Sequence, residues 1–171
     1  HSSPRRQRQM CIRDRFQVRQ YHIYVRPKVV ETLENLTSHY DIAFWSSASN
    51  WFVDDVVSQL LPTYIKPVFQ WSSSQCTYVN KTLIPGRFEV YRKDLENVVQ
   101  LGYDWQNILM IDDTPIKILP EEKNVIQPKT YTGKIIDDEF YFLETYLLHL
   151  KNSEDVRAVD KTAWKASYKL I

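Results

Sequence analysis

The chain has 171 residues, a formal net charge of +1 at pH 7, 43% hydrophobic residues and 13% aromatic residues. This composition excludes an intrinsically disordered chain, and the length suits one α/β domain with a full-sized core. No uninterrupted apolar run approaches the length of a membrane span, so we expect no membrane segment. The two cysteines, Cys11 and Cys76, have no metal-ligand spacing and build no disulfide framework, which fits a reducing, intracellular compartment.

The N-terminal end differs in charge from the rest of the chain. Residues 1–20 carry six arginines and one aspartate, and a basic arm of this kind could bind nucleic acid or direct localisation. However, residues 6–15 have no helical or strand periodicity, and they resemble translated sequencing-adapter sequence. We therefore expect residues 1–15 to be a non-native or disordered arm, with no nucleic-acid partner, and the domain to span residues 16–171.

Strand-like and helix-like pieces alternate from residue 16 onward, which is typical of a parallel sheet flanked by helices in an α/β fold. Runs of aromatic and β-branched residues bounded by turn residues predict the strands. These are expected at residues 21–25, 41–45, 107–111 (a buried strand) and 124–127.

Apolar residues at spacings of three and four predict the helices. The first begins at Pro27, whose fixed φ suits a first helical turn. The second is capped by Ser49 or Asn50 and ends at Pro62. The expected inward residues are Val29, Leu33 and Leu36; Phe52, Val53, Val56, Val57, Leu60 and Leu61; Leu95, Val98 and Val99 in a helix over 93–101; and Phe140, Leu143, Tyr146, Leu147 and Leu150.

Three further segments complete the predicted domain. Residues 66–90 contain short β-prone pieces and predict a small antiparallel insertion, which could cap the site. Residues 116–119 predict a short helix. From about residue 154 we expect a second C-terminal helix that docks through Val156, Val159 and Trp164.

Two adjacent carboxylates follow the strand expected at residues 107–111. Asp112 and Asp113 would lie at the rim where ligands bind in open α/β sheets. Neighbouring acids repel, so a partner charge is needed to keep both ionised. Mg²⁺, which prefers oxygen ligands and bridges to phosphate, could supply it. The alternative is a solvated turn, because Asp and Pro are common in turns.

Two other polar residues occupy comparable places. Ser46 is the first residue after the strand expected at 41–45, where its hydroxyl could bind a phosphate oxygen beside free backbone N–H groups. Lys93 stands at a helix start and could neutralise phosphate charge in a transition state. Considered singly, Ser46 is a residue of the helix cap and Lys93 an ordinary surface lysine.

The order of these residues resembles motifs two, three and four of the haloacid dehalogenase superfamily of phosphotransferases. The closer resemblance is to the phosphatases of the RNA polymerase II C-terminal domain, the NLI-interacting-factor-like phosphatases, and it covers about residues 20–160. The stretches that carry it are Arg26-Pro27, Phe44-Trp45-Ser46-Ser47-Ala48, Lys93-Asp94-Leu95, Ile111-Asp112-Asp113-Thr114-Pro115 and residues 124–128.

This resemblance implies a Rossmann-like, haloacid-dehalogenase-type sheet and a Mg²⁺-dependent protein serine/threonine phosphatase that acts through an aspartyl-phosphate. Ser46 would hold the transferring phosphoryl group, and Lys93 would pair with the phosphate and the nucleophile. Asp113 would be a magnesium ligand, and Asp112 would ligate, orient or act through water. The expected partner is a phosphoprotein or phosphopeptide, the domain would be a monomer, and the family includes nuclear members.

The family's first motif, Asp-x-Asp-x-Thr, supplies the nucleophile and the general acid/base, and this sequence contains no such motif. Either the sequence is truncated and has lost its first strand, or the chain is a natural relative without a nucleophile. Ser46 has no neighbouring base to activate it, so we expect the chain as given to be inactive. One alternative is a non-catalytic binding module on the same fold. Another is a phosphatase for small metabolites; such enzymes typically have large caps, so the short insertion at 66–90 argues against it.

Overall fold

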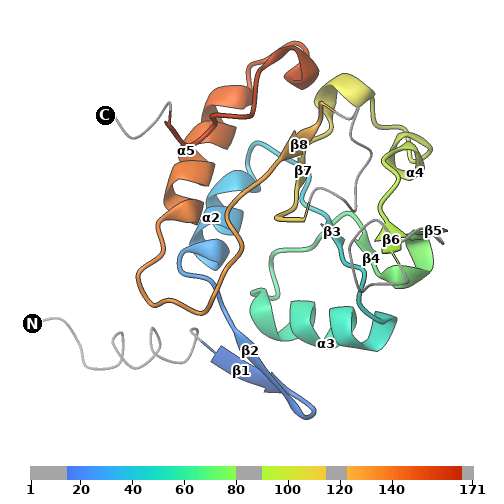
Figure 1. Ribbon diagram of the computed structural model, residues 1–171, viewed down its shortest axis with the longest axis vertical. Coiled ribbons are helices and arrows are strands. Elements are labelled where there is room, and N and C mark those ends of the chain that lie inside the picture. The colour runs from blue at the N-terminus through green and yellow to red at the C-terminus, as the bar shows by residue number, and fades with distance from the viewer. Residues whose placement is uncertain (1–14, 80–89, 115–122, 167–171) are drawn as a thin grey trace, which may run out of the picture.

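The strands form four two-stranded ladders in the computed structural model, which describes residues 15–79, 90–114 and 123–166 (Figure 1). Two ladders are antiparallel and two are parallel. The antiparallel pairs are β1 (Arg15–Val18) with β2 (Tyr21–Tyr24) and β5 (Thr77–Val79) with β6 (Val90–Arg92); the parallel pairs are β3 (Phe44–Trp45) with β4 (Gln70–Trp71) and β7 (Met110–Ile111) with β8 (Val125–Ile126).

The predicted pattern of buried apolar residues agrees best with the longest described helix, α5. In α5 four of the five predicted inward residues, Leu143, Tyr146, Leu147 and Leu150, are buried, and Phe140 is partly buried against the same cluster. None of the helices described combines the length and apolarity needed to cross a membrane. The elements are α2 (Val29–Leu36), α3 (Asn50–Leu60), α4 (Glu96–Val99) and α5 (Glu139–Leu150), with 3-10 turns η1 (Ser73–Gln75), η2 (Trp105–Asn107) and η4 (Val156–Ala158).

Helices α2 and α5 lie side by side (Figure 1), and they are joined by both apolar and polar contacts. Leu36 of α2 belongs to the same buried cluster as the inward residues of α5. The carboxylate of Glu144 accepts a hydrogen bond from the Thr32 hydroxyl and another from the Asn35 side chain, each 2.8 Å long. The pair of helices is therefore fixed in rotation as well as in distance.

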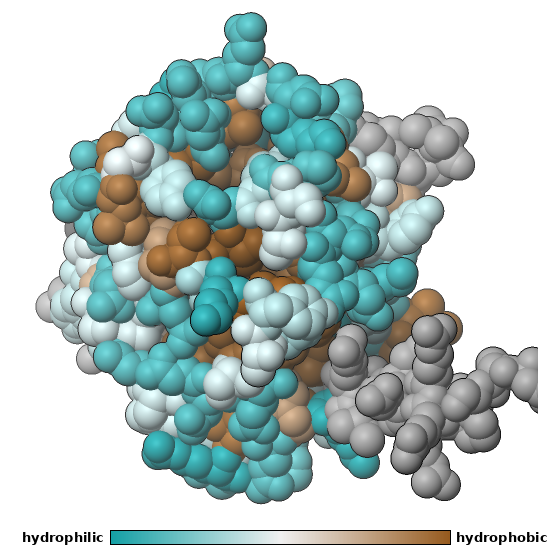
Figure 2. Space-filling model, turned by 180° about the vertical axis from the view of Figure 1, so that it is seen from behind, coloured by the Kyte–Doolittle hydropathy of each residue, from teal (hydrophilic) through white to brown (hydrophobic). Residues whose placement is uncertain are grey.

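The parallel ladders have apolar side chains on two faces. Ile42 and Leu109 pack on the cluster of α2 and α5, whereas Trp45 and Met110 pack on a second cluster around Leu95. Successive residues of a strand point to opposite faces, so the segments of β3 and β7 lie between two apolar layers. On the side opposite to Figure 1, apolar side chains reach the surface near its centre and are surrounded by polar ones (Figure 2).

Part of the expected antiparallel insertion at 66–90 was predicted wrongly. Gln70 and Trp71 pair parallel with β3, so they extend its ladder. The Trp71 ring meets the Trp45 ring edge-on at 4.8 Å, and this packing ties β4 to the core. Residues 77–79 and 90–92 do pair antiparallel, while residues 80–89 lie outside the described part.

Several element ends also differ from the predictions. Helix α2 begins at Val29 rather than Pro27, because Lys28 adopts a left-handed φ of 70°. The helix expected over 93–101 is α-helical only at Glu96–Val99, with turns on either side. The strand expected at 107–111 contains only Met110 and Ile111, and Ile111 is 39% exposed rather than buried.

The helix expected from about residue 154 is a 3-10 turn followed by irregular chain, although Val156 and Trp164 are buried as predicted. The ammonium of Lys161 donates to the carbonyl oxygens of Val156 and Val159, which a regular helix would use itself. The short helix expected at 116–119 lies outside the described residues.

A partly buried ion pair joins the start of the domain to the loop before α5. The Arg26 guanidinium donates to both carboxylate oxygens of Asp137, at 2.8 and 2.9 Å, and to the carbonyl oxygen of Lys129 at 2.8 Å. The two side chains are only 10% and 14% exposed. The hydrogen bond from Arg26 holds the pKa of Asp137 below its usual range.

Replacing Arg26 by leucine removes the hydrogen-bonded cation of the partly buried Asp137 carboxylate. We expect the free energy of unfolding to fall by about 2 kcal/mol at pH 7, measured by urea denaturation. Because the folded-state pKa of Asp137 is lowered, the stabilisation is present above the usual aspartate pKa and is lost as the pH falls below about 4. The variant should therefore lose less stability on acidification than the wild type does.

The matched control is Arg157→Leu, which removes an arginine from a more exposed pair with Asp155 at 2.7 Å. Surface pairs contribute little, so this variant should unfold close to the wild-type urea midpoint. If both variants lost similar amounts of unfolding free energy, the Arg26–Asp137 pair would not stabilise the fold more than a surface pair does.

Candidate functional site

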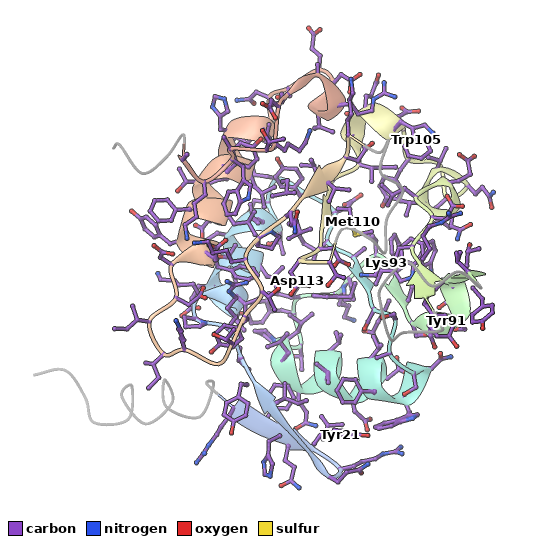
Figure 3. All side chains as sticks on the ribbon, in the orientation of Figure 1. Tyr21, Tyr91, Lys93, Trp105, Met110 and Asp113 are labelled. Atoms are coloured by element: carbon purple, nitrogen blue, oxygen red, sulfur yellow. The ribbon has the colours of Figure 1, made fainter. Side chains whose placement is uncertain are left out.

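Lys93 is a buried residue that follows β6 directly. It is 6% exposed, and its ammonium donates to Oδ2 of Asp112 at 2.6 Å. The reading of Lys93 as a surface lysine is therefore wrong. Figure 3 shows Lys93 and Asp113 near the middle of the molecule, away from Tyr21 on the β1–β2 hairpin.

The two adjacent acids follow β7, as predicted, but they have different surroundings. Both oxygens of the buried Asp112 are engaged: Oδ2 by Lys93, and Oδ1 by the backbone N–H of Thr114 at 2.8 Å. The half-buried Asp113 accepts one hydrogen bond at Oδ1, from the Thr114 hydroxyl at 2.9 Å. Its Oδ2 has no hydrogen-bond partner among the residues described, so Asp113 is the acid with an open oxygen.

Ser46 lies at the carboxyl end of β3, as predicted. Its backbone N–H donates to the carbonyl oxygen of Trp71 at 3.0 Å, which continues the parallel ladder beyond the strand. Its hydroxyl oxygen accepts the backbone N–H of Ala48 at 3.1 Å, and this bond leaves the hydroxyl proton available to a ligand. Ser46 occupies the turn before α3, whereas Ser49 is at the N-cap position and makes no side-chain capping bond.

The structure joins Lys93, Asp112 and Asp113 into one connected group, but no hydrogen bond links Ser46 to that group within the described residues. A residue that the sequence analysis did not assign to the site is Thr114, which contacts both acids. The sequence could have predicted this role, because a hydroxyl residue directly after Asp-Asp can form a hydrogen bond with either carboxylate.

Two residues on the β8 side support the acidic turn and were also missed. Buried Asn124 donates to the carbonyl oxygens of Trp105 and Ile108, at 2.6 and 2.7 Å, and so fixes the approach to β7. The side-chain amide of Gln127 donates to the carbonyl oxygen of Asp113 at 3.4 Å. No periodic pattern predicts either bond, because each joins segments that are distant in the sequence.

The residues of the acidic turn fit a magnesium ion. Mg²⁺ in phosphate-handling sites takes one or two protein carboxylates and completes its shell with water and phosphate oxygens. Asp113 offers one open carboxylate oxygen of this kind. Across residues 15–79, 90–114 and 123–166 no group of three or more His, Cys, Asp or Glu side chains comes together, so these residues form no all-protein cage.

Neutralising Lys93 should destabilise the fold, because it leaves the Asp112 carboxylate buried beside Asp113. We expect Lys93→Met to lower the free energy of unfolding by about 3 kcal/mol or more, measured by urea denaturation. The double variant Lys93→Met/Asp112→Asn should recover part of this loss, since neither charge then remains unpaired. Strictly additive losses in the double-mutant cycle would contradict the ion pair.

The comparisons with known proteins agree with the residues assembled here. No curated protein matches the chain. The family profile described as NLI interacting factor-like phosphatase matches residues 1–157. This match confirms the resemblance indicated by Ser46, Lys93 and the Asp112-Asp113 pair, and it indicates a phosphatase with phosphoprotein substrates. The chain belongs to the NLI interacting factor-like phosphatase family.

Proposed function

We propose that the complete domain is a Mg²⁺-dependent protein serine/threonine phosphatase, and that the chain as given is inactive because its sequence carries no Asp-x-Asp-x-Thr nucleophile. The observation that carries the proposal is the buried Lys93–Asp112 pair, 2.6 Å long, beside an acid with an open oxygen. A buried ion pair of this kind contributes little to stability compared with well-packed apolar side chains, so its presence favours a functional role.

The residues divide the work of binding a phosphoryl group. Asp113 would hold the metal through Oδ2, and Asp112 would orient Lys93 rather than ligate. The Lys93 ammonium has three donors and gives one to Asp112, so it can give another to a phosphate oxygen. Ser46 would donate its hydroxyl proton to the same phosphoryl group. The ion, when bound, neutralises charge on the phosphoryl oxygens.

The arrangement of the strands supports a haloacid-dehalogenase-type sheet that lacks one strand. Among the described residues β3 pairs only with β4, and β7 pairs only with β8. Both strand segments nevertheless contact the same two apolar clusters. In a haloacid-dehalogenase-type sheet a further parallel strand would lie between β3 and β7, and its carboxyl end would reach the same edge as Ser46 and Asp113. That strand would carry the missing nucleophile.

The test compares the 171-residue chain with a reading frame that includes an apolar strand ending in Asp-x-Asp-x-Thr. We expect no hydrolysis of an aryl phosphate by the chain as given, and hydrolysis by the longer protein only when Mg²⁺ is present. Equal activity in excess chelator would contradict the assignment of Asp113 as a magnesium ligand. A complete frame that lacks the motif would remove the catalytic proposal and leave a non-catalytic binding module.

Within the longer protein, Asp113→Asn should weaken the dependence on Mg²⁺, and Ser46→Ala should lower kcat/KM by roughly 10²-fold, the effect of losing one donor to a charged transition state. The matched control is Asp104→Asn, because Asp104 is an exposed aspartate whose side chain makes no capping bond. If Asp104→Asn and Asp113→Asn changed the Mg²⁺ dependence equally, Asp113 would not be the ligand.

A further inference from the structure

Thr114 makes two hydrogen bonds to the acidic pair, one from its backbone and one from its side chain. Its backbone N–H donates to Oδ1 of Asp112 at 2.8 Å, and its hydroxyl donates to Oδ1 of Asp113 at 2.9 Å. The backbone bond survives any side-chain substitution, but the second bond depends on the hydroxyl. Among the described residues, this hydroxyl is the only group that bonds a carboxylate oxygen of Asp113.

The number of free oxygens matters for the choice between divalent cations. Ca²⁺ accepts six to eight oxygen ligands at longer distances and commonly takes both oxygens of a carboxylate. Mg²⁺ requires near-octahedral geometry at short distances, which a carboxylate satisfies through one oxygen. A hydroxyl that occupies Oδ1 of Asp113 leaves Oδ2 for a one-oxygen contact and opposes a two-oxygen contact.

The other oxygens of the acidic turn cannot readily supply a second protein ligand to a cation at Asp113. Each oxygen of Asp112 already accepts a hydrogen bond, one of them from the Lys93 ammonium. The carbonyl oxygen of Asp113 accepts the Gln127 amide, and Gln127 is itself anchored through its carbonyl oxygen by the Trp164 indole N–H at 3.0 Å. The backbone of Asp113 is thus held from the β8 side while Thr114 holds its side chain.

We infer that Thr114 is a specificity-determining residue that favours Mg²⁺ over Ca²⁺ by keeping Asp113 a one-oxygen ligand. This inference deepens the proposed function, because it rests on Asp113 as the metal ligand. Thr114 acts through Asp113 and is a positioning residue, not a catalytic one.

The test measures metal binding by the chain as it exists, without any need for catalysis. Mn²⁺ is titrated into the protein and free Mn²⁺ is followed by electron paramagnetic resonance; Mg²⁺ or Ca²⁺ is then added to displace it. In the wild type we expect Mg²⁺ to displace Mn²⁺ at lower concentration than Ca²⁺ does. In Thr114→Val, which keeps the shape but loses the hydroxyl, the affinity for Ca²⁺ relative to Mg²⁺ should rise on the order of tenfold.

Three variants make the result specific. Thr114→Ser restores the hydroxyl and should return the wild-type ratio of affinities, which a purely structural role of the threonine methyl would not do. Thr145→Val removes an exposed hydroxyl bonded to the carbonyl oxygen of Tyr141 and should leave the ratio unchanged. Asp113→Asn should weaken Mn²⁺ binding, because the amide keeps a neutral oxygen but loses the negative charge, and this loss places the probe at the acidic turn.

The failure of the inference and that of the proposed function give different results. If the wild type binds Mn²⁺ through Asp113 but Thr114→Val keeps the wild-type ratio, the inference is overturned and the metal site stands. If the wild type binds no Mn²⁺, or if Asp113→Asn binds it equally well, the metal assignment in the proposed function is overturned together with the inference.

Discussion

An ammonium and a carboxylate that leave water together must meet closely, because each alone would cost several kcal/mol to bury. Lys93 and Asp112 meet this condition at 2.6 Å, with both side chains less than a tenth exposed. Lys93 follows β6 and Asp112 follows β7, so their contact fixes the end of the antiparallel hairpin against the end of a parallel strand. It also distinguishes the two acids, since both oxygens of Asp112 accept hydrogen bonds whereas, among the described residues, only Oδ1 of Asp113 does.

The ladder that presents these acids is short and depends on support from the C-terminal segment. A pair of two-residue strands has few hydrogen bonds of its own, and here Lys161 supplements them. Its buried ammonium donates to the carbonyl oxygen of Lys123, just before β8, and to those of Val156 and Val159. Burial lowers the pKa of Lys161, and the nearby charges of Asp155 and Asp160 oppose that shift. Trp164 binds the other end of β8 through Gln127, and thus the C-terminal residues reach the acidic turn.

The sequence predicted those parts of the fold that depend on residues close together in the chain. The spacing of Leu143, Tyr146, Leu147 and Leu150 predicted the buried face of α5, and Pro62 marked the end of α3. The places of Ser46 and Asp112-Asp113 at strand ends were also predictable. The burial of Lys93 and the parallel pairing of β4 were not, because a charge partner or a neighbouring strand leaves no periodic trace in the sequence. The bonds from Lys161 to the carbonyl oxygens of Val156 and Val159 were not predictable either, and they lie where a C-terminal helix was expected and a 3-10 turn is found.

The balance of charge at the acidic pair links the proposed metal to the proposed further strand. In the described site two carboxylates face one ammonium, which leaves a single excess negative charge near Asp113. A strand carrying a nucleophilic aspartate would raise that excess, and a bound phosphoryl group would raise it further. In the proposed function a divalent cation would offset this added negative charge. A domain that carries the nucleophilic aspartate would then bind the cation more tightly than one without it. The contact between Lys93 and Asp112 needs neither the cation nor the aspartate, because the ammonium and the carboxylate bond each other directly.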